Sequence, residues 1–74
     1  MMTIGEQIHL IRKRNKETQK DLADAIKVAP SAVSHWELEK QEPNAYAIRE
    51  ICKHYQISAD WLLGLDKIGM KEVK

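Results

Sequence analysis

The sequence has few of the features that mark secreted, membrane-spanning or sheet-rich proteins. Among its 74 residues Cys52 is the only cysteine, so no internal disulfide can form, and a lone thiol favours the reducing cytoplasm. No apolar run approaches the length of about 18 residues that a transmembrane helix needs. In residues 1–14 the charges follow the apolar residues, which is the wrong order for a secretion signal. With three glycines, two prolines and no apolar–polar alternation, the sequence predicts an all-α protein.

Signatures of catalysis and of metal binding are missing as well. There is no P-loop, nucleophile elbow, H-E-x-x-H motif or pair of carboxylates at catalytic spacing. Ser34 and His35 are neighbours on an expected helix, so they point about 100° apart and cannot act as nucleophile and base. The histidines fall on different expected helices without metal-ligand spacing. We therefore expect neither an enzyme nor a cofactor.

The charge balance argues neither strongly for nor strongly against a nucleic-acid partner. Twelve basic and eleven acidic residues give a net charge of +1, lower than is common among DNA-binding domains. The basic residues are clustered, however, and only Glu17 opposes them locally. Such a patch can meet phosphate even when the total charge is small, although a solvated helix end explains it equally well. The clustered residues are Arg12, Lys13, Arg14, Lys16 and Lys20.

The centre of the chain, residues 18–37, reads as two short helices joined by a tight turn. Thr18 can cap the first helix, with Asp21 as the acidic partner of a capping box. Pro30 suits the first turn of the second helix, where its missing N–H has no consequence. That helix is apolar on one side, at Val33 and Trp36. Its other side is small or polar, as a helix in a DNA major groove requires, with Ser31, Ala32, Ser34 and His35.

Three further helices are predicted around this segment. The first spans about residues 4–14 and buries a stripe of isoleucines. Another spans about residues 45–55 and has a full apolar stripe, and a short one follows Ser58 and ends near Gly64. The caps expected for these helices are Thr3, Asn44 and Ser58. The apolar stripes are Ile4, Ile8 and Ile11 in the first and Ile48, Ile51, Cys52 and Tyr55 in the second.

The order of these segments resembles the five-helix DNA-binding domain of lambda-type repressors, Cro proteins and Xre-like bacterial regulators. The motifs that carry the resemblance are IGEQIHLIR, TQKDLA, AVSHWE, PNAYAIREI and ISADWLLG, at near-family spacing. We therefore expect one helix-turn-helix domain at residues 1–64. Residues 65–74 would form a tail that serves dimerisation.

The resemblance also implies roles for individual residues. Gln19 would contact a DNA phosphate and brace the recognition helix, and Thr18 and the Lys40–Asn44 region would supply further backbone contacts. Arg12 and Glu37 match a structural ion pair between the first and third helices. The positions that would face DNA, with Ser31 and His35 as the best base-reading sites, are Pro30, Ser31, Ala32, Ser34 and His35.

Some positions depart from the family pattern. Ala29 stands where a Ser or Thr usually caps the third helix, a loss of about 1 kcal/mol. Four other residues stand where glycine is common and the backbone often has positive φ, which strains a non-glycine residue by about 1–2 kcal/mol. These four are Lys16, Lys27, Glu39 and Gln56.

The function implied is that of a sequence-specific transcriptional regulator in the cytoplasm. It would act as a repressor that binds a pseudo-palindromic double-stranded DNA operator as a homodimer. The dimer surface would include Trp61, Leu62, Leu65 and Ile68. Two alternatives stay open. One is the antitoxin of a toxin–antitoxin pair, whose tail would meet a regulatory protein partner. The other is a protein-interaction module of the same fold without DNA binding, favoured by Glu37, Glu39 and Glu42 beside the recognition helix.

Overall fold

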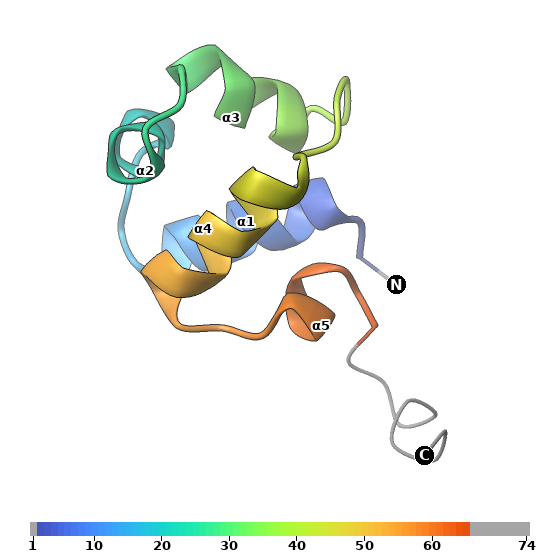
Figure 1. Cartoon of the computed structure of the whole chain (residues 1–74). Coiled ribbons are helices and arrows are strands. Elements are labelled where there is room, and N and C mark those ends of the chain that lie inside the picture. Colours follow the sequence, from blue (N-terminus) through green and yellow to red (C-terminus); the bar gives the residue numbers. More distant parts are fainter. Residues whose placement is uncertain (1, 66–74) are drawn as a thin grey trace.

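The computed structural model describes residues 2–65, which form five helices and no strand. They are α1 (Ile4–Arg14), α2 (Gln19–Ile26), α3 (Pro30–Glu37), α4 (Ala45–Tyr55) and α5 (Ala59–Leu62). Helix α3 packs against α2 and α1, and α5 packs against α4 and α1, so α3 and α5 lie at opposite ends of the fold (Figure 1). None of the described helices is long and apolar enough to cross a membrane. Apart from Leu65, the predicted tail lies outside the described residues.

Side-chain caps define where four of the helices begin. Thr3 and Thr18 each form a complete capping box, with Glu6 and Asp21 respectively. Asn44 accepts the amide of Ala47 at 2.9 Å at the start of α4, and Ser58 accepts that of Trp61 at 3.0 Å at the start of α5. Each of these caps was predicted from the sequence, because an N-cap is a local property. Helix α3 begins at Pro30 without a side-chain cap on Ala29, also as predicted.

The core is built from one apolar stripe of each helix. Trp36 from α3 lies in it and is 6% exposed, which confirms a packing role for this tryptophan. The stripe predicted for α4 needs correction, since Ala47 and Ile51 are the buried residues of that helix while Ile48, Cys52 and Tyr55 only flank them. The core residues are Ile8, Leu22, Ala23, Ile26, Val33, Trp36, Ala47, Ile51 and Leu62.

A left-handed residue follows within two positions of the end of each of the first four helices. The backbone has φ values of 57° at Lys16, 64° at Lys27, 63° at Glu39 and 57° at Gln56. All four positions were predicted from the resemblance to have positive φ. Each therefore carries strain of about 1–2 kcal/mol that glycine would avoid, so the surrounding packing must hold these turns.

Gly5 lies where the start of α1 packs against the backbone at the end of α3. A Cβ atom built at this position would collide with the carbonyl oxygen of Trp36. Only glycine therefore allows the start of α1 to pack directly on the end of α3, which positions the helix carrying the predicted DNA-facing residues. No pattern in the sequence indicates this role of Gly5.

Candidate nucleic-acid interface

Helix α3 lies at the edge of the fold (Figure 1). Pro30 and Ser31 are exposed, and Ser34 and His35 are half-buried. Ser31, Ser34 and His35 stand at positions i, i+3 and i+4, so they share one face of the helix. Ala32 is also half-buried and packs partly against the core, which leaves only part of its methyl surface for a ligand. The structure thus brings the predicted base-reading residues together on one helix.

The predicted phosphate contacts of α2 lie in a shallow basic groove beside the first turn of α3. Thr18, Gln19 and Pro30 line this groove together with Lys13, Lys16 and Lys20, as well as Arg12 and Glu17. The Thr18 hydroxyl oxygen accepts the amide of Asp21 at 3.0 Å, and its O–H remains able to donate. Basic side chains and the amino end of α2 favour an anion here. We call these eight residues the basic groove.

Arg12 and Glu37 form a buried, bidentate ion pair between α1 and α3. Arg12 Nε donates to Glu37 Oε2 at 2.7 Å and Nη2 donates to Oε1 at 2.8 Å. Their side chains are only 8% and 7% exposed. The remaining Arg12 nitrogen, Nη1, donates to the Glu17 carbonyl oxygen at 2.8 Å, which fixes the α1–α2 corner. This geometry confirms the structural pair implied by the resemblance.

Several elements converge on the Glu37 carboxylate. Gln19 Nε2 from α2 donates to Oε1 at 3.1 Å, which confirms that Gln19 braces α3, and His9 Nδ1 lies 3.1 Å from the same oxygen. Burial raises the pKa of Glu37, but the hydrogen bonds from Arg12, Gln19 and His9 lower it by a larger amount. The pKa of Glu37 therefore lies below its usual value. The carboxylate therefore stays ionised at neutral pH.

This pair changes two expectations about charge. Arg12 is committed to Glu37 and is 6% exposed, so it does not belong to the phosphate-facing part of the basic cluster. Conversely, the negative charge of Glu37 is neutralised inside the fold and does not face a ligand of α3. Electrostatic repulsion from Glu37 is therefore not an argument for the protein-interaction alternative.

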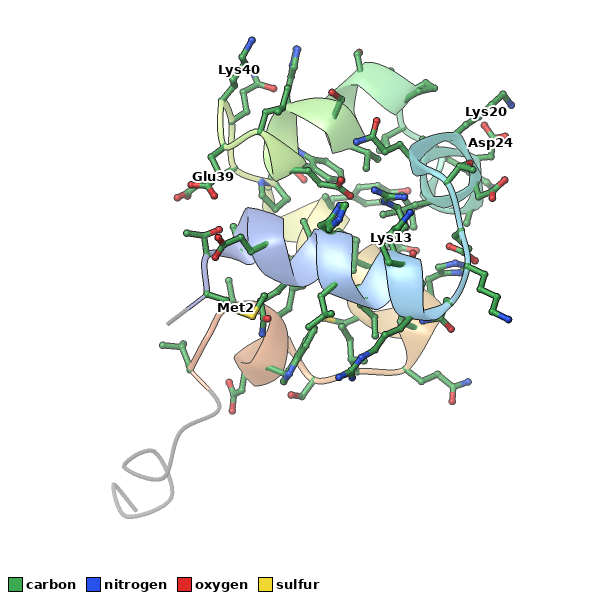
Figure 2. The ribbon with its side chains drawn as sticks, turned by 180° about the vertical axis from the view of Figure 1, so that it is seen from behind. Met2, Lys13, Lys20, Asp24, Glu39 and Lys40 are labelled. Carbon is green, nitrogen blue, oxygen red and sulfur yellow. The ribbon has the colours of Figure 1, made fainter. Side chains whose placement is uncertain are left out.

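The loop after α3 places Lys40 and Asn44 at the surface, as expected. The Lys40 amide donates to the His35 carbonyl oxygen at 2.9 Å, so the loop closes directly onto the recognition helix. Asn44 uses its Oδ1 to cap α4, which leaves its amide group as the donor that can reach a phosphate. The Glu39 carboxylate accepts the Thr3 hydroxyl at 2.8 Å and lies beside the start of α1, whereas Lys40 points away from the fold (Figure 2).

One contact that supports the interface had no signal in the sequence. The Tyr46 hydroxyl donates to the Ile26 carbonyl oxygen at 3.0 Å, so α4 satisfies a free carbonyl at the end of α2. It thereby holds the turn at Lys27 that sets α3 relative to α2. Among the described residues, no three His, Cys, Asp or Glu side chains are arranged to hold a metal ion.

Comparisons with known proteins agree with this arrangement. The helix-turn-helix family model matches residues 8–62. The HTH-type transcriptional regulator DicA of Escherichia coli (strain K12) is 40% identical over 62 residues, which cover 84% of this chain and 46% of DicA. Repressor protein C2 of Salmonella phage P22 is 37% identical over 60 residues, which cover 81% of this chain and 28% of C2. The chain thus spans about half the length of DicA and less of C2.

The fold is also similar to a solved repressor structure. The crystal structure of the P22 c2 repressor protein in complex with synthetic operator 9T superposes with a TM-score of 0.82 at 35% identity. The match covers 89% of this chain and all of that chain. A solution structure of the P22 c2 DNA-binding domain gives a TM-score of 0.77 at 34% identity. The named relatives are regulators and repressors of transcription, which is not an enzyme class.

Proposed function

The chain belongs to the lambda-repressor-like helix-turn-helix family, and we propose that it binds double-stranded DNA sequence-specifically and represses transcription at a pseudo-palindromic operator. One observation carries the proposal: the polar face of α3 lies beside the basic groove of α2, in a fold that superposes on a repressor bound to operator DNA. The protein would act in the cytoplasm, where the DNA lies.

In this proposal one set of residues contacts the bases and another contacts the phosphates. Base edges would be read by α3, where His35 donates to guanine N7 or O6, Ser31 and Ser34 donate or accept, and Ala32 touches a thymine methyl beside Pro30. No residue on this face can make a bidentate contact to a base, so DNA shape would contribute to the choice of sequence. Phosphates would be bound by Thr18, Gln19, Lys40 and Asn44.

We propose that the protein binds as a homodimer, which would double the length of the DNA sequence that is recognised. One α3 helix covers a single half-site, and two such helices read half-sites about 34–36 Å apart. The exposed apolar residues next to α5 suggest the surface, since Leu63 is 42% and Leu65 is 45% exposed. Trp61 is half-buried and can contribute, but Leu62 is fully buried and must be removed from the predicted dimer surface. Ile68 lies outside the described residues.

Selection of binding sites from a random DNA pool at two salt concentrations tests the function. We expect enrichment of a short inverted repeat, with binding that weakens steeply as salt rises, because phosphate contacts release counterions. Sedimentation with and without the selected duplex would then report the dimer. Enrichment of no sequence, even at low salt, would contradict the proposal and favour the protein-interaction module. A selected operator together with a tight toxin-like partner would instead identify an antitoxin.

A further inference from the structure

Glu17 brings a negative charge to the place where the proposal needs a phosphate. It is the acidic member of the basic groove and directly precedes Thr18, the N-cap of α2. Its carboxylate is bound by two residues of α4 that do not line the groove. The Tyr55 hydroxyl donates to Oε1 at 2.8 Å, and His54 Nε2 lies 3.0 Å from Oε2 and 3.2 Å from Oε1. These two residues come from a helix that is far from Glu17 in sequence.

The geometry of this cluster restrains the glutamate. The Glu17 and His54 side chains are 26% and 28% exposed, and the His54 ring packs edge-on against Tyr55 with centroids 4.6 Å apart. Burial and the hydrogen bond to Glu17 raise the pKa of the Tyr55 hydroxyl. The hydroxyl therefore stays protonated at physiological pH and can donate this hydrogen bond. Because the Glu17 carbonyl is held by Arg12, only the side chain of Glu17 is free to turn when its α4 partners are lost.

A released carboxylate would have a direct effect on DNA binding. A flexible glutamate in this groove would sample positions close to a phosphate bound there, and two like charges a few ångströms apart repel even through water. Salt screens that repulsion over about 10 Å at 0.1 M. The effect would weaken binding to all sequences alike, since phosphates carry no sequence information.

We propose that Tyr55 and His54 are positioning residues that hold the Glu17 carboxylate against α4 and so keep its charge away from the phosphate bound in the basic groove. The inference rests on the proposed DNA-binding function and assigns it two residues outside the helix-turn-helix. A purely structural role for the same hydrogen bonds is the competing explanation, and it predicts a different response to removal of the charge at position 17.

A double-mutant cycle distinguishes the two explanations. Affinity for a short duplex of arbitrary sequence is measured at low and at high salt for the wild type, Tyr55→Phe, Glu17→Gln and the double variant. We expect Tyr55→Phe to weaken binding about fivefold at low salt and less at high salt. In the Glu17→Gln background the same substitution should have no effect, because no charge is left to release.

Tyr46→Phe is the matched control. Tyr46 is also on α4, and its hydroxyl donates to the Ile26 carbonyl at 3.0 Å, so its loss removes a similar bond without freeing a charge. Any effect of Tyr46→Phe should be the same in the wild-type and the Glu17→Gln backgrounds. Circular dichroism monitors folding, and His54→Gln replaces Tyr55→Phe in the cycle if the latter variant does not fold.

Each outcome decides the matter. A Tyr55→Phe penalty that disappears with Glu17→Gln supports the inference, whereas an equal penalty in both backgrounds, or none in either, overturns it. A wild-type protein that binds no duplex at low salt removes the proposed function and this inference with it. That failure is recognised in the wild type alone, before any variant is compared.

Discussion

Helices α2 and α3 have the same length of eight residues but are held in place by different means. Helix α2 carries its own capping box, in which Thr18 and Asp21 satisfy each other's backbone amides. Helix α3 has no side-chain cap and is held by burial of Val33 and Trp36 and by the ion pair of Glu37. Because all of its anchors lie on one side, the outer side of α3 has no structural task and is free to read a ligand.

Removal of Arg12 should break the anchorage of α3 most severely. Arg12→Met leaves the Glu37 carboxylate buried without its cation, and loss of one partner from a buried pair destabilises a protein by about 3–5 kcal/mol. The free energy of unfolding from urea titration measures this. Lys20→Met is the control, because the Lys20–Asp24 pair is exposed and its loss should have no measurable effect. Equal losses for both variants would contradict the assignment.

The stabilising effect of the Arg12–Glu37 pair should depend on pH. The pKa of Glu37 is lowered in the folded state, so its contribution to stability is complete above its ordinary value of 4.5 and is lost as the pH falls through the lower folded value. In Arg12→Met that advantage is absent. We therefore expect the stability difference between wild type and variant to shrink below pH 4.5. A difference that stays constant in acid would show that Glu37 does not respond to Arg12.

In DNA binding, the two helices should respond differently to loss of a side chain. His35→Ala on α3 should change the preferred base at one position of each half-site, at a cost of about 1–2 kcal/mol for the preferred sequence. Gln19→Ala on α2 should weaken all sequences alike, about tenfold, because a phosphate contact carries no sequence information. Binding-site selection with each variant measures both. An unchanged sequence preference for His35→Ala would remove its base-reading role.

Local features explain why so much of the fold was predictable. N-caps at Thr3, Thr18, Asn44 and Ser58 depend on neighbours within three residues, so helix starts could be predicted from the sequence. The Arg12–Glu37 pair followed from the resemblance. The contacts that were missed join distant segments. They are the close approach at Gly5, the bond from Tyr46 to Ile26 and the α4 partners of Glu17.

The dimer surface shows the limit of a pattern in a very short helix. Leu62 was predicted to lie at the surface because α5 is short and apolar, yet it is fully buried in the core. Leu65, predicted for the same surface, is exposed, and so is Leu63, which was not predicted. Four helical residues contain too little periodicity to show which side faces the core. The side of α5 that faces the core is set by its contacts with α4 and α1, which cannot be read from the four residues of the helix.

Adding a cap to α3 should make it resemble α2. Ala29 has φ −71° and ψ 144°, which suits an N-cap, so the hydroxyl in Ala29→Ser can accept the Ser31 or Ala32 amide and should stabilise the fold by about 1 kcal/mol. Thr18→Ala should have the opposite sign and a similar magnitude. Urea titration gives the free energy of unfolding of both variants. A loss of stability in Ala29→Ser would mean that the α2–α3 turn does not admit a hydroxyl.

The smallest expected effect concerns the turn between the two helices. Lys27 has φ 64° and ψ 48°, and Gln56, which ends α4, has φ 57° and ψ 49°. Glycine relieves about 1–2 kcal/mol of strain at either site but loses about 0.5–1 kcal/mol through unfolded-state entropy. We expect Lys27→Gly and Gln56→Gly each to stabilise the fold by about 0.5–1 kcal/mol, measured by thermal unfolding. If only Gln56→Gly stabilises, the Lys27 side chain must itself support the turn that orients α3 on α2. The two helices of the motif would then depend on their connection as well as on their separate anchors.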